Sequence, residues 1–150
     1  MKLIRADQNY LDTAESIVHA SIREAYSPCY PGEVVEFFLH VIHTRENISR
    51  DIAAGNLWLM EENGVFFGTG CLRGDEITRV YFLPEYQNKG YGGQMMDFLE
   101  GMAEHRTVRL SPSLPAESFY QKRGYRLISR EDCPLEHGVV LRHDIMEKHL

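Results

Sequence analysis

The sequence predicts a single α+β domain whose mixed sheet carries helices on both faces, and three observations indicate this class. Helical periodicity fills the N-terminal third, from about residue 11 to residue 55. Strand-like segments separated by turn residues follow, between residues 57 and 83. Strand and helix patterns then alternate to the C-terminus. Helices first, a meander next and strand–helix–strand units last are typical of a sheet covered on both sides.

Composition and charge indicate one globular domain spanning residues 1–150. Hydrophobic residues make up 43% and charged residues 25%, and no apolar run approaches the roughly 20 residues of a membrane span. The charged N-terminus argues against a secretory signal, so we expect a cytoplasmic protein. Three separated cysteines disfavour disulfides and a thiolate metal site. The net charge of −6, without a basic stretch, disfavours nucleic-acid binding. It would suit a cationic substrate, although solubility explains it equally well.

Three helices are expected before residue 56. The first has apolar residues three and four positions apart, namely Leu11, Ala14, Val18, Ile22 and Ala25. Asp7 or Asn9 can cap it. The second has one apolar face formed by Val34, Phe37, Phe38 and Val41. The third follows a cap at Thr44 and ends at Gly55.

Strands are expected in the middle of the chain and near its end. Asn63-Gly64 tolerates positive φ at both central positions of a hairpin turn, which predicts that segments 57–61 and 65–72 pair. Gly74 lies in the next turn, which leads into a strand over 76–83. Further strands are predicted at 2–6, 107–110, 125–128 and 139–146, further helices at 92–105 and 116–123, and an irregular stretch at 129–137.

The segment from Val80 to Gly93 carries the strongest functional signal. A hydrophobic strand ends at Pro84, and three glycines in four positions precede a helix. Bare glycine backbone lets N–H groups approach an anion closely, and a helix N-terminus adds partial positive charge. The turn therefore suits a diphosphate, although its spacing matches neither a P-loop nor a dinucleotide fingerprint. A glycine-rich helix start with no ligand remains the alternative.

Two motifs resemble those of the GNAT acetyltransferase family. Gln87-x-x-Gly90-x-Gly92, preceded by Pro-Glu-Tyr, resembles the family's coenzyme A signature. The stretch from Ser113 to Tyr125 independently resembles the family segment with a Phe-Tyr-x-x-x-Gly-Phe/Tyr core. The similarity covers essentially the whole chain. It implies a twisted, mostly antiparallel sheet of six to seven strands.

The resemblance implies an N-acetyltransferase that uses acetyl-CoA and no metal, and acetylates a primary amine of a small molecule or peptide by direct attack. A non-catalytic acyl-CoA-binding or regulatory module remains open, as does a phosphate-ligand protein of another class. The acceptor is equally open among polyamines, aminoglycoside-like amines, amino acids and protein N-termini. A homodimer is compatible with the family. Coenzyme contacts are implied for Phe82, Leu83, Gln87, Asn88, Lys89, Gly90, Tyr91, Gly92, Gly93 and Tyr120.

Tyr120 and Glu76 are the candidates for the chemistry. By resemblance, Tyr120 occupies the place of the family's tyrosine acid, and a phenol with a pKa of about 10 can protonate a departing thiolate. Glu76 begins the central strand at the spacing before Gln87 where some members place a catalytic glutamate. It is the candidate base, with ordered water as the alternative. A packing tyrosine and a solvated carboxylate are the simpler interpretations of the two residues.

Other residues are weaker candidates. Tyr26, Tyr30 and Tyr86 are aromatic residues that could line an acceptor cleft, and ordinary packing also accounts for them. His40-x-x-His43 has helical spacing but lacks a third metal ligand.

Overall fold

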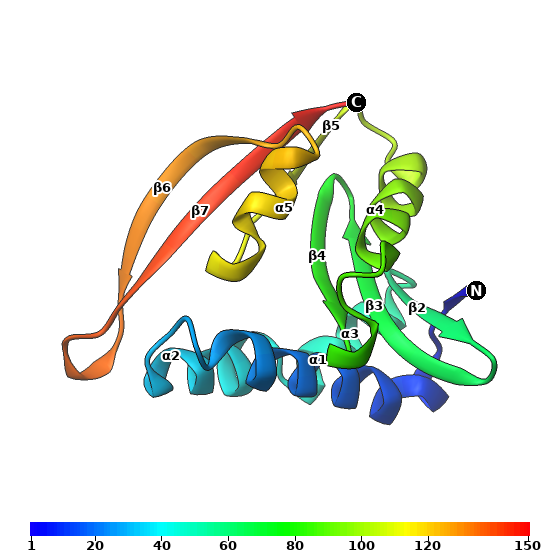
Figure 1. Cartoon of the computed structure of the whole chain (residues 1–150), viewed down its shortest axis with the longest axis horizontal. Helices are drawn as coiled ribbons and strands as arrows, with labels where there is room; N and C mark the ends of the chain where they lie inside the picture. The colour runs from blue at the N-terminus through cyan, green and yellow to red at the C-terminus, as the bar shows by residue number, and fades with distance from the viewer.

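One seven-stranded sheet organises the computed structural model, which describes residues 1–150 throughout (Figure 1). The strands are β1 (Lys2–Arg5), β2 (Leu57–Glu62), β3 (Val65–Arg73), β4 (Glu76–Phe82), β5 (Thr107–Leu110), β6 (Arg126–Pro134) and β7 (Val140–His149). The α-helices are α1 (Leu11–Tyr26), α2 (Gly32–Phe37), α3 (Arg45–Ala53), α4 (Tyr91–Met102) and α5 (Glu117–Lys122). Shorter helical turns are η1 (Gln8–Tyr10), η2 (Phe38–Ile42), η3 (Pro84–Tyr86), η4 (Leu114–Ala116) and η5 (Glu136–Gly138). None of the helices combines the length and the hydropathy needed to cross a membrane.

The strand order is β1-β2-β3-β4-β5-β7-β6, and only the β4–β5 pair is parallel. The predicted α+β class with a mostly antiparallel sheet is therefore confirmed. β4 and β5 share a single register pair, Glu76 opposite Arg109, and separate beyond it. The sheet thus has two halves, β1–β4 and β5–β7, which diverge in Figure 1.

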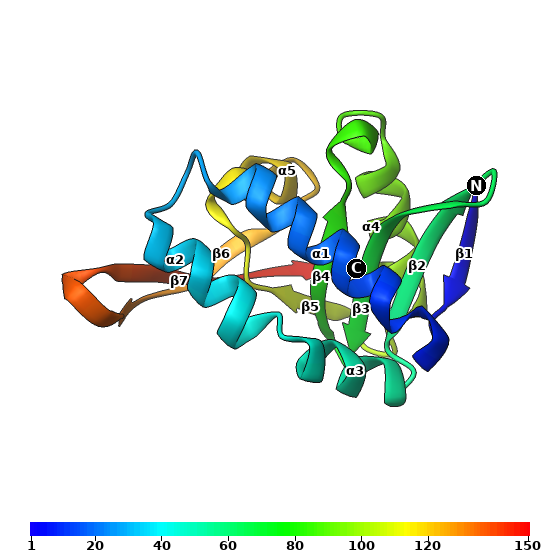
Figure 2. The same cartoon turned by 90° about the horizontal axis from the view of Figure 1, so that it is seen from below.

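Two apolar clusters fill the two faces of the sheet. Helices α1 and α3 cover one face, where buried residues include Val18, Ile22, Ile48, Leu57 and Leu59. Helices α4 and α5 cover the opposite face, where buried residues include Met60, Phe67, Met95, Met96 and Leu99. Neighbouring residues of β2 point to opposite faces, as the period of a strand requires. Figure 2 shows α1 in front of β3 and β4, with α4 behind them.

The helix boundaries follow local capping chemistry. Thr44 caps α3 as predicted, because its Oγ1 accepts a hydrogen bond from the Asn47 N–H at 3.1 Å. The Asp7 carboxylate accepts one from the Asn9 N–H at 2.8 Å and so caps η1. The prediction that Asp7 or Asn9 caps α1 itself is wrong, since the N-cap of α1 is Tyr10 and makes no side-chain bond.

The predicted apolar face of the second helix is partly wrong: Val34 is buried and Phe38 packs against the core, but Val41 is not buried. Val41 is 55% exposed, whereas the buried side chains of this region are Val34, Val35 and Leu39. The helix continues from α2 into a π-helical turn, η2, in which the His43 N–H donates to the Phe38 carbonyl at 2.8 Å. A π turn adds one residue to the repeat and therefore shifts the phase of every later side chain.

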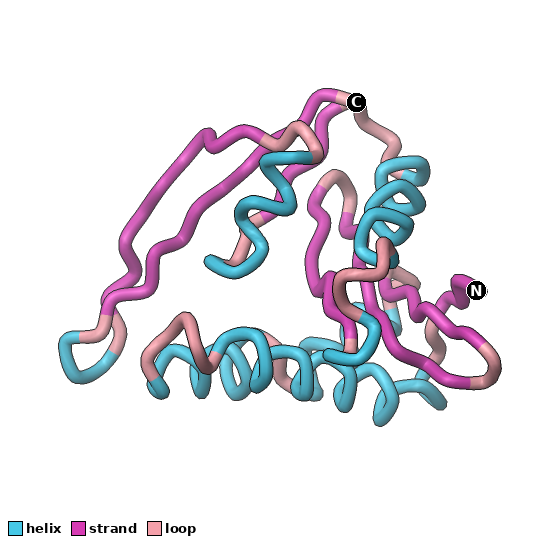
Figure 3. The backbone as a smooth tube through the Cα atoms, in the orientation of Figure 1, coloured by secondary structure: helices cyan, strands magenta, loops and turns pink.

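The stretch 129–137, predicted to be irregular, is largely strand. β6 runs to Pro134 and stays paired with β7 as far as Val140, giving the long hairpin drawn in magenta in Figure 3. β6 lies at the edge of the sheet, so its charged residues meet solvent. An edge strand tolerates such a polar sequence, which resembles a loop when read alone.

Candidate active site

A β-bulge in β4 opens the sheet at the candidate site. Between its pairs with Thr69 and Cys71 of β3, β4 accommodates an extra residue, and Arg79 has a φ of 51°. The Thr69 hydroxyl donates to the Arg79 carbonyl at 2.7 Å and holds this conformation. A bulge bends its strand and increases the twist. β4 therefore leaves β5 just beyond Glu76, and two adjoining cavities lie around this divergence.

The first cavity, of about 410 Å³, lies beside the loop between η3 and α4. None of the six backbone N–H groups from Asn88 to Gly93 donates to an acceptor within the protein. Gly90 is the N-cap of α4 with a φ of 87°, and a Cβ there would meet no protein atom within 4 Å. The loop thus presents a row of free donors at a helix N-terminus, which is the chemistry of an anion site.

The structure brings most of the predicted coenzyme residues to this cavity. Its lining includes Phe82, Gln87, Asn88, Gly90, Gly92, Gly93 and Tyr120. The Gln87 side chain donates its Nε2–H to the Phe82 carbonyl at 2.9 Å, and the Ser21 hydroxyl donates to the same oxygen at 2.8 Å. Gln87 therefore ties the loop to the end of β4.

Three predicted coenzyme residues have side chains outside the cavity lining. Tyr91 donates its hydroxyl to Glu62 at 2.6 Å, and the Lys89 ammonium lies 5.8 Å from the Tyr86 ring centre. Leu83 packs against the apolar clusters on both faces. The backbone N–H groups of Lys89 and Tyr91 remain free, so these two residues offer donors to the loop through the main chain alone.

Tyr120 lies on α5 between two aromatic rings. Its ring is 8% exposed, packs against Phe119 and Tyr125, and lines the first cavity. Its hydroxyl makes no hydrogen bond within the protein, and burial raises the pKa of Tyr120 above its usual value. The phenol therefore stays protonated at neutral pH and is free to donate to a ligand.

The second cavity, of about 810 Å³, adjoins the first. Both are lined by Tyr26, Ile77, Thr78, Arg79, Tyr81, Ser111 and Ser113. Glu76 and Tyr30 line only the second cavity, whereas Tyr120 and Tyr86 line only the first. The structure thus places the two predicted catalytic residues on adjoining cavities rather than side by side.

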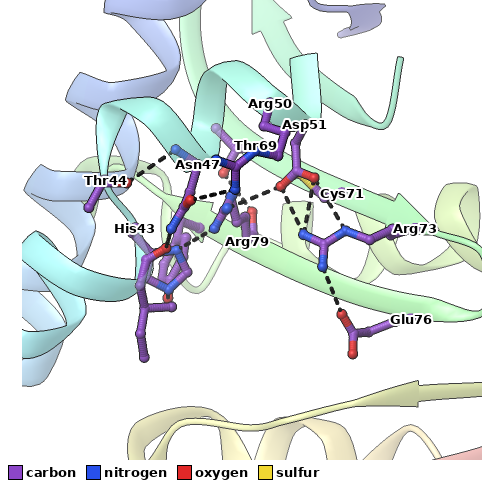
Figure 4. Close-up of polar contacts among 12 residues, drawn as sticks. His43, Thr44, Asn47, Arg50, Asp51, Thr69, Cys71, Arg73, Glu76 and Arg79 are labelled. Carbon is purple, nitrogen blue, oxygen red and sulfur yellow. Dashed lines mark hydrogen bonds and ion pairs between the residues drawn. The ribbon is translucent and has the colours of Figure 1, made fainter. Parts of the chain in front are cut away.

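A chain of charged side chains crosses the wall of the second cavity (Figure 4). Asp51 lies between Arg79 at 3.1 Å and Arg73 at 3.0 Å, and Arg79 and Asp51 are each 5% exposed. Arg73 also contacts Glu76 at 3.5 Å. Because buried charges are costly without partners, this pairing holds the bulged Arg79 in place.

Arg79 also sets the protonation of His43. A guanidinium cannot accept a hydrogen bond, so the 2.8 Å contact must run from Arg79 Nη1 to His43 Nδ1. Burial, with Arg79 adding to it, lowers the pKa of His43 to about 3. The neutral ring therefore carries its proton on Nε2 and donates it to the Tyr81 hydroxyl at 3.0 Å. Tyr81 in turn contacts the Tyr26 hydroxyl at 2.9 Å, so its own proton points to Tyr26, where the two cavities meet.

Sequence reasoning missed this buried chain of Asp51, Arg79, His43 and Tyr81. A charged residue within a strand, such as Arg79, was the one available signal, because it has no place in an apolar core without a partner. His40 does not join His43; it is exposed and pairs with Glu36 at 2.8 Å. No group of three or more His, Cys, Asp or Glu side chains is placed to hold a metal ion.

Comparison with known proteins identifies the family that this fold and site define. The sequence profile described as Acetyltransferase (GNAT) domain matches residues 26–144. The chain therefore belongs to the GNAT acetyltransferase family. Comparison with curated protein sequences finds no significant match.

Solved structures share this fold over nearly the whole chain. A GCN5-related N-acetyltransferase from Rhodopseudomonas palustris superposes with a TM-score of 0.88 at 24% identity, covering 99% of this chain and 95% of that one. PaiA N-acetyltransferase from Thermoplasma acidophilum, in complex with coenzyme A, gives 0.77 at 18% identity, with 99% and 98% covered. YncA from Salmonella typhimurium, with its cofactor acetyl-CoA, gives 0.73 at 17% identity, with 100% and 94% covered.

Proposed function

We propose that this protein transfers an acetyl group from acetyl-CoA to a primary amine. The observation that carries the proposal is the row of six unpartnered N–H groups from Asn88 to Gly93 at the N-terminus of α4. Such donors suit the diphosphate of coenzyme A. A Cβ built at Gly90 would meet no protein atom within 4 Å, so the space beside these donors is open and has room for that group. The coenzyme-bound relatives of the same fold support the assignment.

The end of β4 suits the pantetheine arm. Beyond Glu76, β4 has no pairing with β5, so its N–H groups on that side are available to an extended ligand, whereas the Phe82 carbonyl already accepts from Gln87 and Ser21. A backbone N–H at Phe82 or Leu83 is the candidate donor to the oxyanion, although the Leu83 N–H already donates to the Phe67 carbonyl at 2.9 Å. Phe82 is therefore the better candidate. Loss of one such donor costs roughly 3 kcal/mol in other acyl-transfer enzymes.

Proton transfer completes the reaction. An amine with a pKa near 10.4 is charged at pH 7, and making it neutral costs about 4.6 kcal/mol. Glu76, half exposed at the wall of the second cavity, is the proposed base, with ordered water as the alternative. Tyr120, whose hydroxyl is free, is the proposed acid that protonates the leaving thiolate.

Binding and turnover measured together test the proposal. Calorimetry should show binding of coenzyme A, and weaker binding of nucleotides that lack pantetheine. Release of free thiol from acetyl-CoA should then depend on an added amine from a broad panel. Normal binding with no amine-dependent release would identify a non-catalytic acyl-CoA module. Equal binding of the truncated nucleotides would identify a phosphate-ligand protein of another class.

A further inference from the structure

The wall of the second cavity carries arginines from four separate elements. Arg50 comes from α3, Arg73 from β3 and Arg79 from β4, and Arg142 lines the cavity from β7. The only carboxylates on this wall are Asp51 and Glu76. The excess of positive charge is local, because the whole chain has a net charge of −6.

One of these four arginines has no carboxylate partner within the protein. Asp51 is shared by Arg79 and Arg73, and Arg73 is also the partner of Glu76. Arg142 is matched by Glu117 at 3.0 Å and by Asp144 at 3.3 Å. Arg50 makes no ion pair; its one side-chain partner is the neutral Asn47 amide oxygen at 3.0 Å. Both carboxylates of the wall are therefore engaged, and the Arg50 guanidinium is available.

The histidines of this wall add no negative charge. His43 is neutral because burial lowers its pKa to about 3. His143 is exposed, and an imidazole side chain carries no negative charge. A ligand with a second ammonium group would thus face guanidinium groups and two carboxylates that arginines already pair, an arrangement that Coulomb repulsion disfavours.

We infer that the acceptor is a small amine that also carries a carboxylate, such as an amino acid, with its carboxylate on the Arg50 side of the second cavity. The inference rests on the proposed function. A single unmatched guanidinium balances one negative charge, which favours a carboxylate over a doubly charged phosphate. A cavity of about 810 Å³ is in the range that encloses a small molecule. The amine end then reaches the junction with the coenzyme cavity, where Tyr26 and Tyr81 lie.

Matched acceptors test the inference. Amino acids, their carboxamides, the corresponding aminophosphonates and 1,4-diaminobutane are compared in the amine-dependent thiol-release assay. We expect the amino acids to have the highest kcat/KM. Equal or better use of the carboxamides or the diamine would overturn the inference while leaving the acetyltransferase function in place. Preference for the phosphonates would overturn the carboxylate assignment. Thiol release with no amine at all would overturn the proposed function and this inference with it.

Arg50 variants locate the contact. Arg50→Gln should raise KM for the amino acids about 10- to 100-fold, the effect of losing one charged hydrogen bond, and leave KM for the carboxamides within about twofold. Arg50→Lys keeps the charge and should retain most of the preference. Arg126→Gln, an exposed arginine of β6 outside both cavities, is the matched control and should change nothing. Equal losses for amino acids and carboxamides in Arg50→Gln would overturn the assignment.

Discussion

At the scale of the residue, Tyr120 has an unusual combination of burial and an unused hydroxyl. Its ring is 8% exposed and packed between aromatic rings, yet its oxygen has no partner within the protein. A buried tyrosine that serves packing alone usually has its hydroxyl satisfied. The free hydroxyl in the first cavity therefore supports the proposed role of general acid.

We expect Tyr120→Phe to lower kcat about 100-fold or more and to leave the affinity for coenzyme A within about twofold, because the acid acts only as the thiolate departs. Steady-state kinetics and calorimetry measure the two effects. Tyr125→Phe is the matched control: its hydroxyl donates to Glu100 at 2.8 Å, outside both cavities, so the change should lower stability and spare kcat. Unchanged turnover in Tyr120→Phe would remove this residue from the mechanism.

His43 should make the stability of the protein depend on pH. Its pKa is lowered from 6.5 to about 3 in the folded state, so between these values the unfolded chain binds a proton that the folded chain does not. The free energy of unfolding should therefore fall as the pH drops from about 6.5 to 3, by up to about 1.4 kcal/mol per pH unit from this residue.

His43→Gln should remove that slope, since glutamine does not titrate. Urea unfolding at a series of pH values measures the free energy of unfolding of each variant, and the gap between wild type and His43→Gln should narrow toward low pH. His40→Gln, at an exposed site paired with Glu36, should keep the slope of the wild type. Parallel curves for wild type and His43→Gln would contradict the assignment.

At the scale of the element, the junction between η3 and α4 depends on backbone conformation. Gly90 adopts a φ of 87°, a conformation that costs a side-chain-bearing residue roughly 1–2 kcal/mol. Gly92 has a different constraint, because a Cβ there would lie 3.3 Å from the Phe119 ring. Glycine at these two positions keeps the free N–H groups aligned and α4 close to α5.

Gly90→Val should abolish measurable binding of coenzyme A, because the branched side chain strains the loop and occupies the space beside the donors. Gly92→Val should weaken binding because its side chain would collide with the Phe119 ring. Calorimetric titration measures both. Gly101→Val makes the same change near the end of α4, where a Cβ meets nothing within 4 Å, and should bind normally. Near-normal titration of Gly90→Val would count against the anion site.

At the scale of the whole molecule, the two halves of the sheet are joined at β4 and β5 through one register pair. The free N–H groups belong to the loop after β4, whereas Tyr120 belongs to α5, which follows β5. The first cavity, where we propose that coenzyme A binds, is therefore lined by both halves. A ligand bound there contacts both halves and should stabilise the folded state as a unit.

Coenzyme A at 100 times its Kd should raise the free energy of unfolding by about 2.7 kcal/mol, provided that the unfolded chain does not bind it. Urea unfolding with and without the ligand measures the effect. Gly90→Val should show no rise, and Gly101→Val should show the rise of the wild type. An unchanged midpoint for the wild-type protein at that concentration would contradict binding to the folded state.

Local chemistry explains which features could be predicted from the sequence. The hairpin at Asn63-Gly64, the Thr44 cap and the glycine turn at Gly90 depend on residues within a few positions of one another, and all three appear where they were expected. The apolar face of the second helix, which the π turn η2 changes, and the length of β6 were mispredicted. The first depends on a rare backbone repeat, and the second depends on pairing with β7.

The sequence by itself determined the fold class, the strand order within the meander and the loop that presents free N–H groups, because periodicity and turn chemistry are local properties. Only the tertiary structure decided how Asp51, Arg79 and His43 meet, and that Arg50 is left without an ionic partner on the cavity wall. These residues come from different elements, and no spacing along the chain records which side chains face each other across a cavity. The bulge at Arg79 could not be predicted for a similar reason, since an extra residue in β4 is defined only by the pairing of β4 with β3.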